Sequence, residues 1–99
     1  MMKLIAKIHK VGQEKIVAVC DKNLLNKTIK FGEVKVVVDE EFYGNQEVDV
    51  EFLKKELTDA TIGNFIGKGA VKLALKTGLI NEENIIYVGK IPHAQFVVV

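Results

Sequence analysis

The strongest constraint on the fold is an alternation of apolar and polar residues near the start of the chain. In residues 2–9, the apolar side chains of Leu4, Ala6 and Ile8 fall on one face of an extended chain, and the lysines between them fall on the other. Gly12 follows in a short polar segment, and the next segment, KIVAVC, is apolar on both faces. A strand with two apolar faces is expected in the interior of a sheet. The two strand-like segments and the glycine turn between them predict that the chain begins with an antiparallel hairpin.

Further strand-like segments follow this hairpin. Residues 21–27 begin with turn-forming residues and are predicted to form a short helical turn. The segments TIKF and EVKVVV are separated at Gly32 and predict a third strand region or a second hairpin. The segments 85–88 and 94–99 predict two more strands near the end of the chain.

Two helices are predicted between these strand regions. Asp49 is a favourable N-cap for a helix over residues 49–57. Thr58 is a favourable N-cap for a second helix over residues 59–77, which ends before a glycine. Its predicted buried stripe consists of Ile62, Phe65, Ile66, Gly69, Ala70 and Leu73. The order βββ-αα-ββ predicts an α+β fold of one domain, residues 1–99: a two-layer sandwich with both helices on one face of a mostly antiparallel sheet.

The composition favours a small cytoplasmic protein. The chain has 99 residues, enough for one hydrophobic core, and no apolar run approaches the length of about 20 residues that a membrane helix needs. Lysines in the first ten residues argue against a signal peptide. The one cysteine, Cys20, cannot form an internal disulfide, which is typical of a reducing compartment.

All fourteen basic residues are lysine, and several of them are expected to share one surface. Asn64 and three lysines recur every four residues, so they are predicted to line one edge of the second helix. An all-lysine set predicts contact with a phosphate backbone rather than with base edges, and the alternative is a solvated face. The phenylalanines are expected in the core, so no aromatic platform for RNA bases is predicted. The candidates for backbone contact are Lys3, Lys7, Lys68, Lys72 and Lys76, and the phenylalanines assigned to the core are Phe31, Phe52, Phe65 and Phe96.

The segment GNFIGKGAV (63–71) is similar to a phosphate-binding loop but does not have its spacing. A P-loop has four residues before its Gly-Lys pair and a Ser or Thr after it, whereas this segment has three residues and a glycine. Its glycines are also predicted to lie inside a helix, where the amides are already bonded. An anion site would return if the helix broke between Gly67 and Gly69, because a new helix N-terminus would form there.

A second set of polar residues is predicted to bind a ligand if folding brings them together: Asp21, Tyr43, Asn64, His93 and Gln95. His93 follows the only proline, Pro92, so the segment IPHAQ is interpreted either as a turn into the last strand or as a ligand site. If that strand runs antiparallel beside the second strand, His93 and Asp21 share one rim of the sheet. Cys20 is interpreted as a small buried apolar residue unless a histidine lies close enough to activate it. No metal or cofactor site is expected, because the spacing of potential ligands does not match one.

Four motifs occur in order along the chain: VAVCDKNLL, EEFYG, ATIGNFIGKGAV and PHAQ. In these motifs the chain is similar to the small archaeal proteins grouped as domain of unknown function 424, and the similarity covers nearly its whole length. The resemblance implies a compact α/β domain with no assigned activity and an involvement in translation or RNA metabolism. It singles out Cys20, Asp21, Leu24, Leu25, Phe42, Tyr43, Gly44, Asn64, Gly67, Pro92, His93 and Gln95.

Three positions depart from the pattern that this resemblance implies. Asn26 stands where a glycine is expected, and Asn45 follows the FYG motif. The GKG sequence stands where an acidic residue is usual, which argues against an acidic catalytic residue there.

Three functions stay open from the sequence. The leading hypothesis is a non-enzymatic module that binds RNA or a ribonucleoprotein through lysines, with polar contacts from Asn64, His93 and Gln95. The second is a small-molecule enzyme or sensor with a pocket around Asp21, Tyr43, Asn64 and His93, although no catalytic residue is identified. The third is a protein–protein adaptor, or a homo-oligomer, that pairs through an open sheet edge at FVVV.

Overall fold

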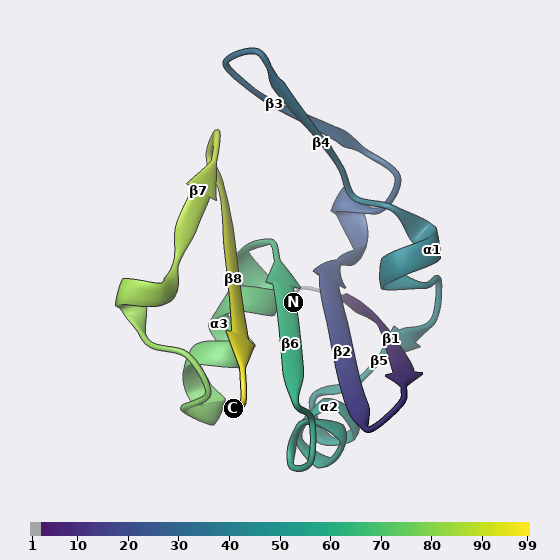
Figure 1. The fold of residues 1–99 in the computed structure, drawn as a ribbon. Helices are drawn as coiled ribbons and strands as arrows, with labels where there is room; N and C mark the ends of the chain where they lie inside the picture. The colour runs from purple at the N-terminus through teal and green to yellow at the C-terminus, as the bar shows by residue number, and fades with distance from the viewer. Residues whose placement is uncertain (1–2) are drawn as a thin grey trace.

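A six-stranded sheet forms the centre of the molecule (Figure 1). The computed structural model describes residues 3–99. The strand order is β5-β1-β2-β6-β8-β7, and neighbours are antiparallel except β2 and β6, which are parallel. The strands are β1 (Leu4–Val11), β2 (Glu14–Asp21), β5 (Glu47–Val48), β6 (Ile62–Ile66), β7 (Ile86–Val88) and β8 (Ile91–Val97).

The two faces of this sheet carry different layers. Val17 and Val19 of β2 join a core with helices α2 (Val50–Leu57) and α3 (Lys68–Thr77) on one face. Successive side chains of a strand point to opposite faces, so Ala18 and Cys20 enter a second core on the other face. That core contains the end of helix α1 (Glu40–Tyr43).

Two further strands form a separate antiparallel ribbon. They are β3 (Thr28–Phe31) and β4 (Val34–Val37), and the ribbon extends beyond the sheet at the top of Figure 1. Short 3-10 turns, η1 (Lys22–Leu24) and η2 (Glu82–Asn84), precede the ribbon and β7 respectively. None of the helices within residues 3–99 has the length and apolar character that crossing a membrane requires.

The predicted α+β fold with a mostly antiparallel sheet is confirmed. Gly12, at φ +60°, turns the chain between β1 and β2. The Asp49 carboxylate accepts the Phe52 amide at 2.8 Å and caps α2, and Gly78 ends α3 at φ +79°. Met2, which the first predicted strand includes, lies outside the described residues.

The predicted helix over residues 59–77 is wrong in its first half. Residues Ile62–Ile66 form β6 between β2 and β8, and α3 begins only at Lys68. Thr58 ends α2, where its hydroxyl donates to a backbone carbonyl, and does not begin a helix. The predicted apolar stripe is therefore divided between a strand and a helix.

Two glycines explain why a strand forms here. A Cβ on Gly63 would lie 2.1 Å from a ring carbon of Phe96, so the glycine leaves room for the Phe96 ring to lie over β6. Gly67 has φ +109°, a backbone conformation that a helix does not contain and that other residues rarely adopt. Between them, Phe65 joins the core beneath the helices and Ile66 joins the core on the opposite face. Because successive side chains of a strand point to opposite faces, β6 contributes residues to both cores, whereas one face of a helix could contact only one core.

The last strand begins earlier than predicted. It starts at Ile91 rather than at residue 94, and the turn before it contains Gly89 at φ +64°. Pro92 and His93 therefore lie within β8, and the interpretation of IPHAQ as a turn is wrong.

Pro92 ends the ladder of hydrogen bonds between β6 and β8. Its carbonyl accepts the Gly67 amide at 2.9 Å, but a proline has no N–H to return a second bond. The Gly67 carbonyl instead accepts the Val71 amide at 3.0 Å, which is the first bond of α3. The segment after β6 therefore leaves the sheet opposite Pro92, and α3 begins there.

Candidate functional site

A groove between α2 and α3 brings four lysines together. Its volume is about 630 Å³. Lys68, Lys72 and Lys76 line it from α3, and Lys54 lines it from α2. The sequence pattern identified the three α3 lysines but missed Lys54, which lies in a predominantly acidic segment. The remaining lining residues are Leu4, Val50, Gly69 and Leu73.

The groove is electropositive because four lysines and, among residues 3–99, no acidic side chain line it. Lys68, Lys72 and Lys76 are exposed, and within residues 3–99 none of them forms an ion pair. Lys54 has one loose contact, 4.0 Å from the Glu51 carboxylate. Several acidic residues outside the groove are engaged elsewhere, as helix caps (Asp39, Asp49) or as partners of other lysines (Glu47, Glu56, Asp59).

Lys3 and Lys7 do not line this groove. The Lys7 ammonium donates to the Glu41 carbonyl of α1 at 3.0 Å, on the side of the sheet that α1 covers. Lys3 precedes β1 near Glu47, whose pKa is lowered first by the hydrogen bond from Lys22 and to a smaller degree by Lys3. The five predicted lysines thus divide between separate surfaces.

The Asp21 carboxylate occupies the N-terminus of α3, where the sequence predicts an anion site if the helix breaks between Gly67 and Gly69. The chain does break before α3, but the Asp21 carboxylate accepts the Gly69 amide at 3.0 Å and the Ala70 amide at 2.8 Å. Asp21 is only 4% exposed, and a Cβ on Gly67 would lie 2.5 Å from its carboxyl carbon. The start of α3 therefore already holds a negative charge supplied by the chain itself.

Three predicted ligand-binding residues form a hydrogen-bonded chain on the opposite face of the sheet. The Tyr43 hydroxyl donates to Asn64 Oδ1 at 2.6 Å, and Asn64 Nδ2 donates to Gln95 Oε1 at 3.4 Å. Burial, and to a smaller degree Cys20, raises the pKa of Tyr43 above its usual range, so the hydroxyl stays a neutral donor. Asp21 is not part of this chain, because it follows Cys20 in β2 and points to the helix side.

His93 lies next to this chain, opposite Ile66 on one side and Ile86 on the other. Its Nδ1 is buried and has no hydrogen-bond partner among residues 3–99. Burial lowers the pKa of His93, and the Phe65 backbone acts in the opposite direction. The ring is therefore neutral at pH 7, and its buried Nδ1 is an unpaired polar atom within the part of the chain that the structure describes.

Cys20 is confirmed as a buried apolar residue. Burial raises the pKa of its thiol to about 12, and the neighbouring Asp21 carboxylate acts in the same direction. The thiol stays protonated at neutral pH, so it does not act as a nucleophile.

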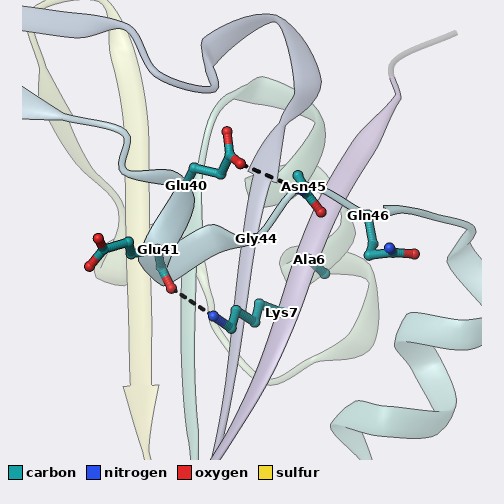
Figure 2. A pocket seen from close by; sticks show the side chains of 7 residues that line it. All are labelled: Ala6, Lys7, Glu40, Glu41, Gly44, Asn45 and Gln46. Atoms are coloured by element: carbon teal, nitrogen blue, oxygen red, sulfur yellow. Dashed lines mark hydrogen bonds between the residues drawn. The ribbon is translucent and has the colours of Figure 1, made fainter.

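A smaller hollow of about 360 Å³ lies between α1 and β1 (Figure 2). In Figure 2 the Lys7 side chain reaches the Glu41 carbonyl, and Asn45 Nδ2 donates to the Glu40 carboxylate at 3.3 Å. Because these polar groups bind each other or the backbone, the hollow offers fewer unpaired groups than the lysine groove.

Two phenylalanines lie outside the core, contrary to the prediction. Phe31 is 56% exposed and Phe52 is 41% exposed. Phe65 is buried and stacks on Phe96 with ring centroids 6.2 Å apart. Exposed aromatic rings are therefore available on strand β3 and helix α2.

The open sheet edge at FVVV lies on β8. Strand β7 pairs with Ile91–His93 and leaves the rest of β8 without a paired strand on that side, within the part of the chain that the structure describes. Val97 is 61% exposed there. Pairing with another chain at this edge stays a prediction.

Comparison with known proteins places this fold in a family. The sequence matches the family described as "Protein of unknown function (DUF424)" over residues 9–99. The chain belongs to the DUF424 family. A crystal structure of an uncharacterized conserved protein from Methanopyrus kandleri is similar to this DUF424 fold, with a TM-score of 0.86, 24% identity, and coverage of 98% of this chain and 92% of that chain. No curated protein matches the sequence.

The motifs that carried the resemblance to DUF424 have structural roles in this chain. Gly44 of FYG has φ +79°, and a Cβ there would lie 3.0 Å from Lys7 Cβ. Asp21 of the CD pair caps α3, and Pro92 of PHAQ ends the β6–β8 ladder. Asn26 has φ +66° at the position where the resemblance implies glycine. Both residue types adopt a positive φ more readily than other residues do, which is the backbone conformation at this position.

Proposed function

We propose that this DUF424 chain is a non-enzymatic, cytoplasmic RNA-binding module that holds a sugar–phosphate backbone in the α2–α3 groove. The observation that supports it most is the convergence of Lys54, Lys68, Lys72 and Lys76 on one groove that no acidic side chain lines. Lysine ammonium groups neutralise phosphates as point charges and release the counterions that surround them. We expect affinity that falls with salt and depends little on base sequence.

The experiment compares RNA binding by two variants of equal net charge. One carries Lys68→Gln, Lys72→Gln and Lys76→Gln, and the control carries the same change at Lys7, Lys10 and Lys55. With a random-sequence RNA at 0.1 M salt, loss of three phosphate contacts is expected to weaken binding on the order of 10- to 100-fold. The control is expected to bind like the unmodified protein. Equal affinities for all three proteins would refute the groove as the binding site.

The link to translation or RNA metabolism that the family resemblance implies belongs to this proposal. RNA that co-purifies with the protein from a native lysate, and that is lost from the α3 triple variant but not from the control, is the expected result. Sequencing that RNA would then identify the class that is bound.

A second candidate function, small-molecule binding, is supported by the buried His93 Nδ1, which has no hydrogen-bond partner among residues 3–99, beside the chain of Tyr43, Asn64 and Gln95. Amide and imidazole groups of this kind can pair with the edge of a nucleobase. NMR shifts of the Asn64 and Gln95 side-chain amides on addition of free nucleosides would support this function. Unchanged spectra at millimolar nucleoside would exclude that ligand class.

A further inference from the structure

The β3–β4 ribbon carries a second basic surface, separate from the α2–α3 groove. Lys30 and Lys35 stand directly opposite each other on the two strands, and both are exposed. Neither forms an ion pair within residues 3–99. Like charges directly opposite each other destabilise a ribbon, so a bound anion would relieve this pair. The lysines thus indicate an anionic partner.

The other face of the ribbon is apolar, and its tip is uncovered. At the base of this face, Ile29 packs against the core on the α1 side of the sheet. At the tip, Phe31 stands opposite Val34, and they are 56% and 57% exposed. The Phe31 ring is therefore presented to solvent at the end of a ribbon that projects beyond the sheet (Figure 1).

A second turn supports the ribbon near this tip. A Cβ on Gly89, in the turn between β7 and β8, would lie 3.4 Å from the Lys30 carbonyl, so the turn packs against β3. Lys90 follows in the same turn and is exposed. Three lysines and one acidic residue occupy the ribbon and this turn: Lys30, Lys35, Lys90 and Glu33.

We infer that the ribbon tip holds one unpaired nucleotide of the bound RNA, with its base stacked on Phe31 and the adjoining phosphates near Lys30 and Lys35. The inference rests on the proposed function and extends it to single-stranded RNA. Lys30 and Lys35 leave the ribbon from the face opposite Phe31, but each is adjacent in sequence to a residue of the apolar tip, so their long side chains can extend to the phosphates on either side of a base stacked on Phe31. Stacking on an aromatic side chain together with phosphate neutralisation is how proteins hold single strands.

The size of the apolar patch also favours a nucleotide over a protein. A stable protein interface buries about 800 Å² of each partner. On this face of the ribbon tip, among residues 3–99, the exposed apolar side chains are Phe31 and Val34, an area that suits one base rather than such an interface. A protein or membrane partner is therefore an outcome that the test must detect.

The test measures binding of a single-stranded RNA decamer and of the same sequence as a duplex. Phe31→Ala is expected to weaken decamer binding about 5- to 100-fold, because a base–aromatic stack is lost, and to change duplex binding by less than about twofold. Val37→Ala is the matched control, since Val37 is also 56% exposed but on the lysine face of the same ribbon. An unchanged thermal unfolding curve of Phe31→Ala confirms that the ribbon stays folded.

Two direct readouts locate the base. The chain has no tryptophan, so Phe31→Trp introduces a single fluorophore whose emission the decamer is expected to quench while its affinity is retained. Photocrosslinking of a 4-thiouridine decamer to the unmodified protein is expected to label the tryptic peptide FGEVK, residues 31–35.

The outcomes separate this inference from the proposed function. If the α3 triple variant loses RNA binding while Phe31→Ala binds the decamer normally and FGEVK is not labelled, the ribbon inference is overturned and the proposed function stands. If the unmodified protein binds neither the single-stranded decamer nor the duplex, both the ribbon inference and the proposed function are refuted. If Phe31→Ala abolishes binding to phosphatidylglycerol vesicles but not to the decamer, the tip is a membrane contact and the inference is overturned.

Discussion

Asn26 illustrates how a single backbone conformation constrains this chain. It follows η1 and has φ +66°, a left-handed conformation that asparagine tolerates better than other residues with a Cβ. The backbone amide of Asn26 donates to the Val38 carbonyl at 2.7 Å, and its side-chain amide donates to the Glu40 carboxylate at 2.9 Å. These bonds hold the base of the ribbon beside α1.

Replacing Asn26 tests whether the backbone conformation or the side-chain bond matters more. Asn26→Ala is expected to lower the free energy of unfolding by about 1 to 2 kcal/mol, because alanine is strained in this conformation. Asn26→Gly is expected to change it by less than about 0.5 kcal/mol, since glycine adopts a positive φ without strain, and this offsets its greater freedom in the unfolded chain and the loss of the exposed Glu40 bond. Urea denaturation of the three proteins measures both effects. An alanine variant as stable as the glycine variant would contradict this explanation.

His93 is expected to make stability depend on pH. Burial lowers its pKa in the folded protein, so the unfolded chain, with a histidine pKa near 6.5, binds a proton that the folded protein does not. Stability should be full above pH 6.5 and fall as the pH decreases below it, by at most about 1.4 kcal/mol per pH unit. Urea midpoints at pH 7.5 and pH 5.5 measure the change.

The control for this prediction is His93→Gln, which keeps a polar side chain but does not titrate. The decrease between pH 7.5 and pH 5.5 is expected to be smaller in the variant than in the unmodified protein. The same decrease in both proteins would show that other groups cause it.

At the scale of elements, the junction between β6 and α3 is where sequence reasoning failed. Phe65 and Ile66 fit the spacing of a helix as well as that of a strand, so periodicity alone could not separate the two. The deciding contacts are long-range: Phe96 approaches Gly63, and the Asp21 carboxylate approaches Gly67. A one-dimensional pattern does not contain those approaches. By contrast, the first hairpin, the Asp49 cap and the end of α3 at Gly78 depend on local residues and were predictable.

Asp21 is expected to be the main link between the sheet and α3. Asp21→Ala would leave two buried or partly buried amides, those of Gly69 and Ala70, without an acceptor, which predicts a loss of about 2 to 4 kcal/mol in the free energy of unfolding. Asp21→Asn keeps one acceptor oxygen and should recover part of this loss. Urea denaturation tests the order of the three proteins. An alanine variant as stable as the asparagine variant would show that the cap contributes little.

At the scale of the whole molecule, the chain has a net charge of only +1, yet its uncompensated charge is positive at two surfaces. Many acidic groups are engaged in structural bonds, either with helix amides or with lysines away from these surfaces. They include Asp21, Asp39, Asp49, Glu47, Glu56 and Asp59. Within residues 3–99, the α3 lysines of the groove and the ribbon lysines Lys30 and Lys35 therefore form no ion pair, and Lys54 has only its loose contact with Glu51.

The candidate sites could be predicted from the sequence only in part. The spacing of Lys68, Lys72 and Lys76 identified one side of the groove, because it depends only on helix periodicity. Lys54 could not be found, since it lies in a predominantly acidic segment and only the packing of α2 against the sheet brings it to α3. Asp21 was grouped with Asn64 and His93, but strand alternation directs its side chain to the opposite face.

The salt dependence of RNA binding measures how many phosphates the lysines of the α2–α3 groove contact. The logarithm of the binding constant for a single-stranded RNA is measured against the logarithm of the KCl concentration. Each phosphate contact contributes about 0.7 to the slope, so the variant with Lys68→Gln, Lys72→Gln and Lys76→Gln should be shallower by about 2. The control variant at Lys7, Lys10 and Lys55 should keep the slope of the unmodified protein. Equal slopes for the α3 variant and the unmodified protein would show that Lys68, Lys72 and Lys76 do not contact the RNA phosphates.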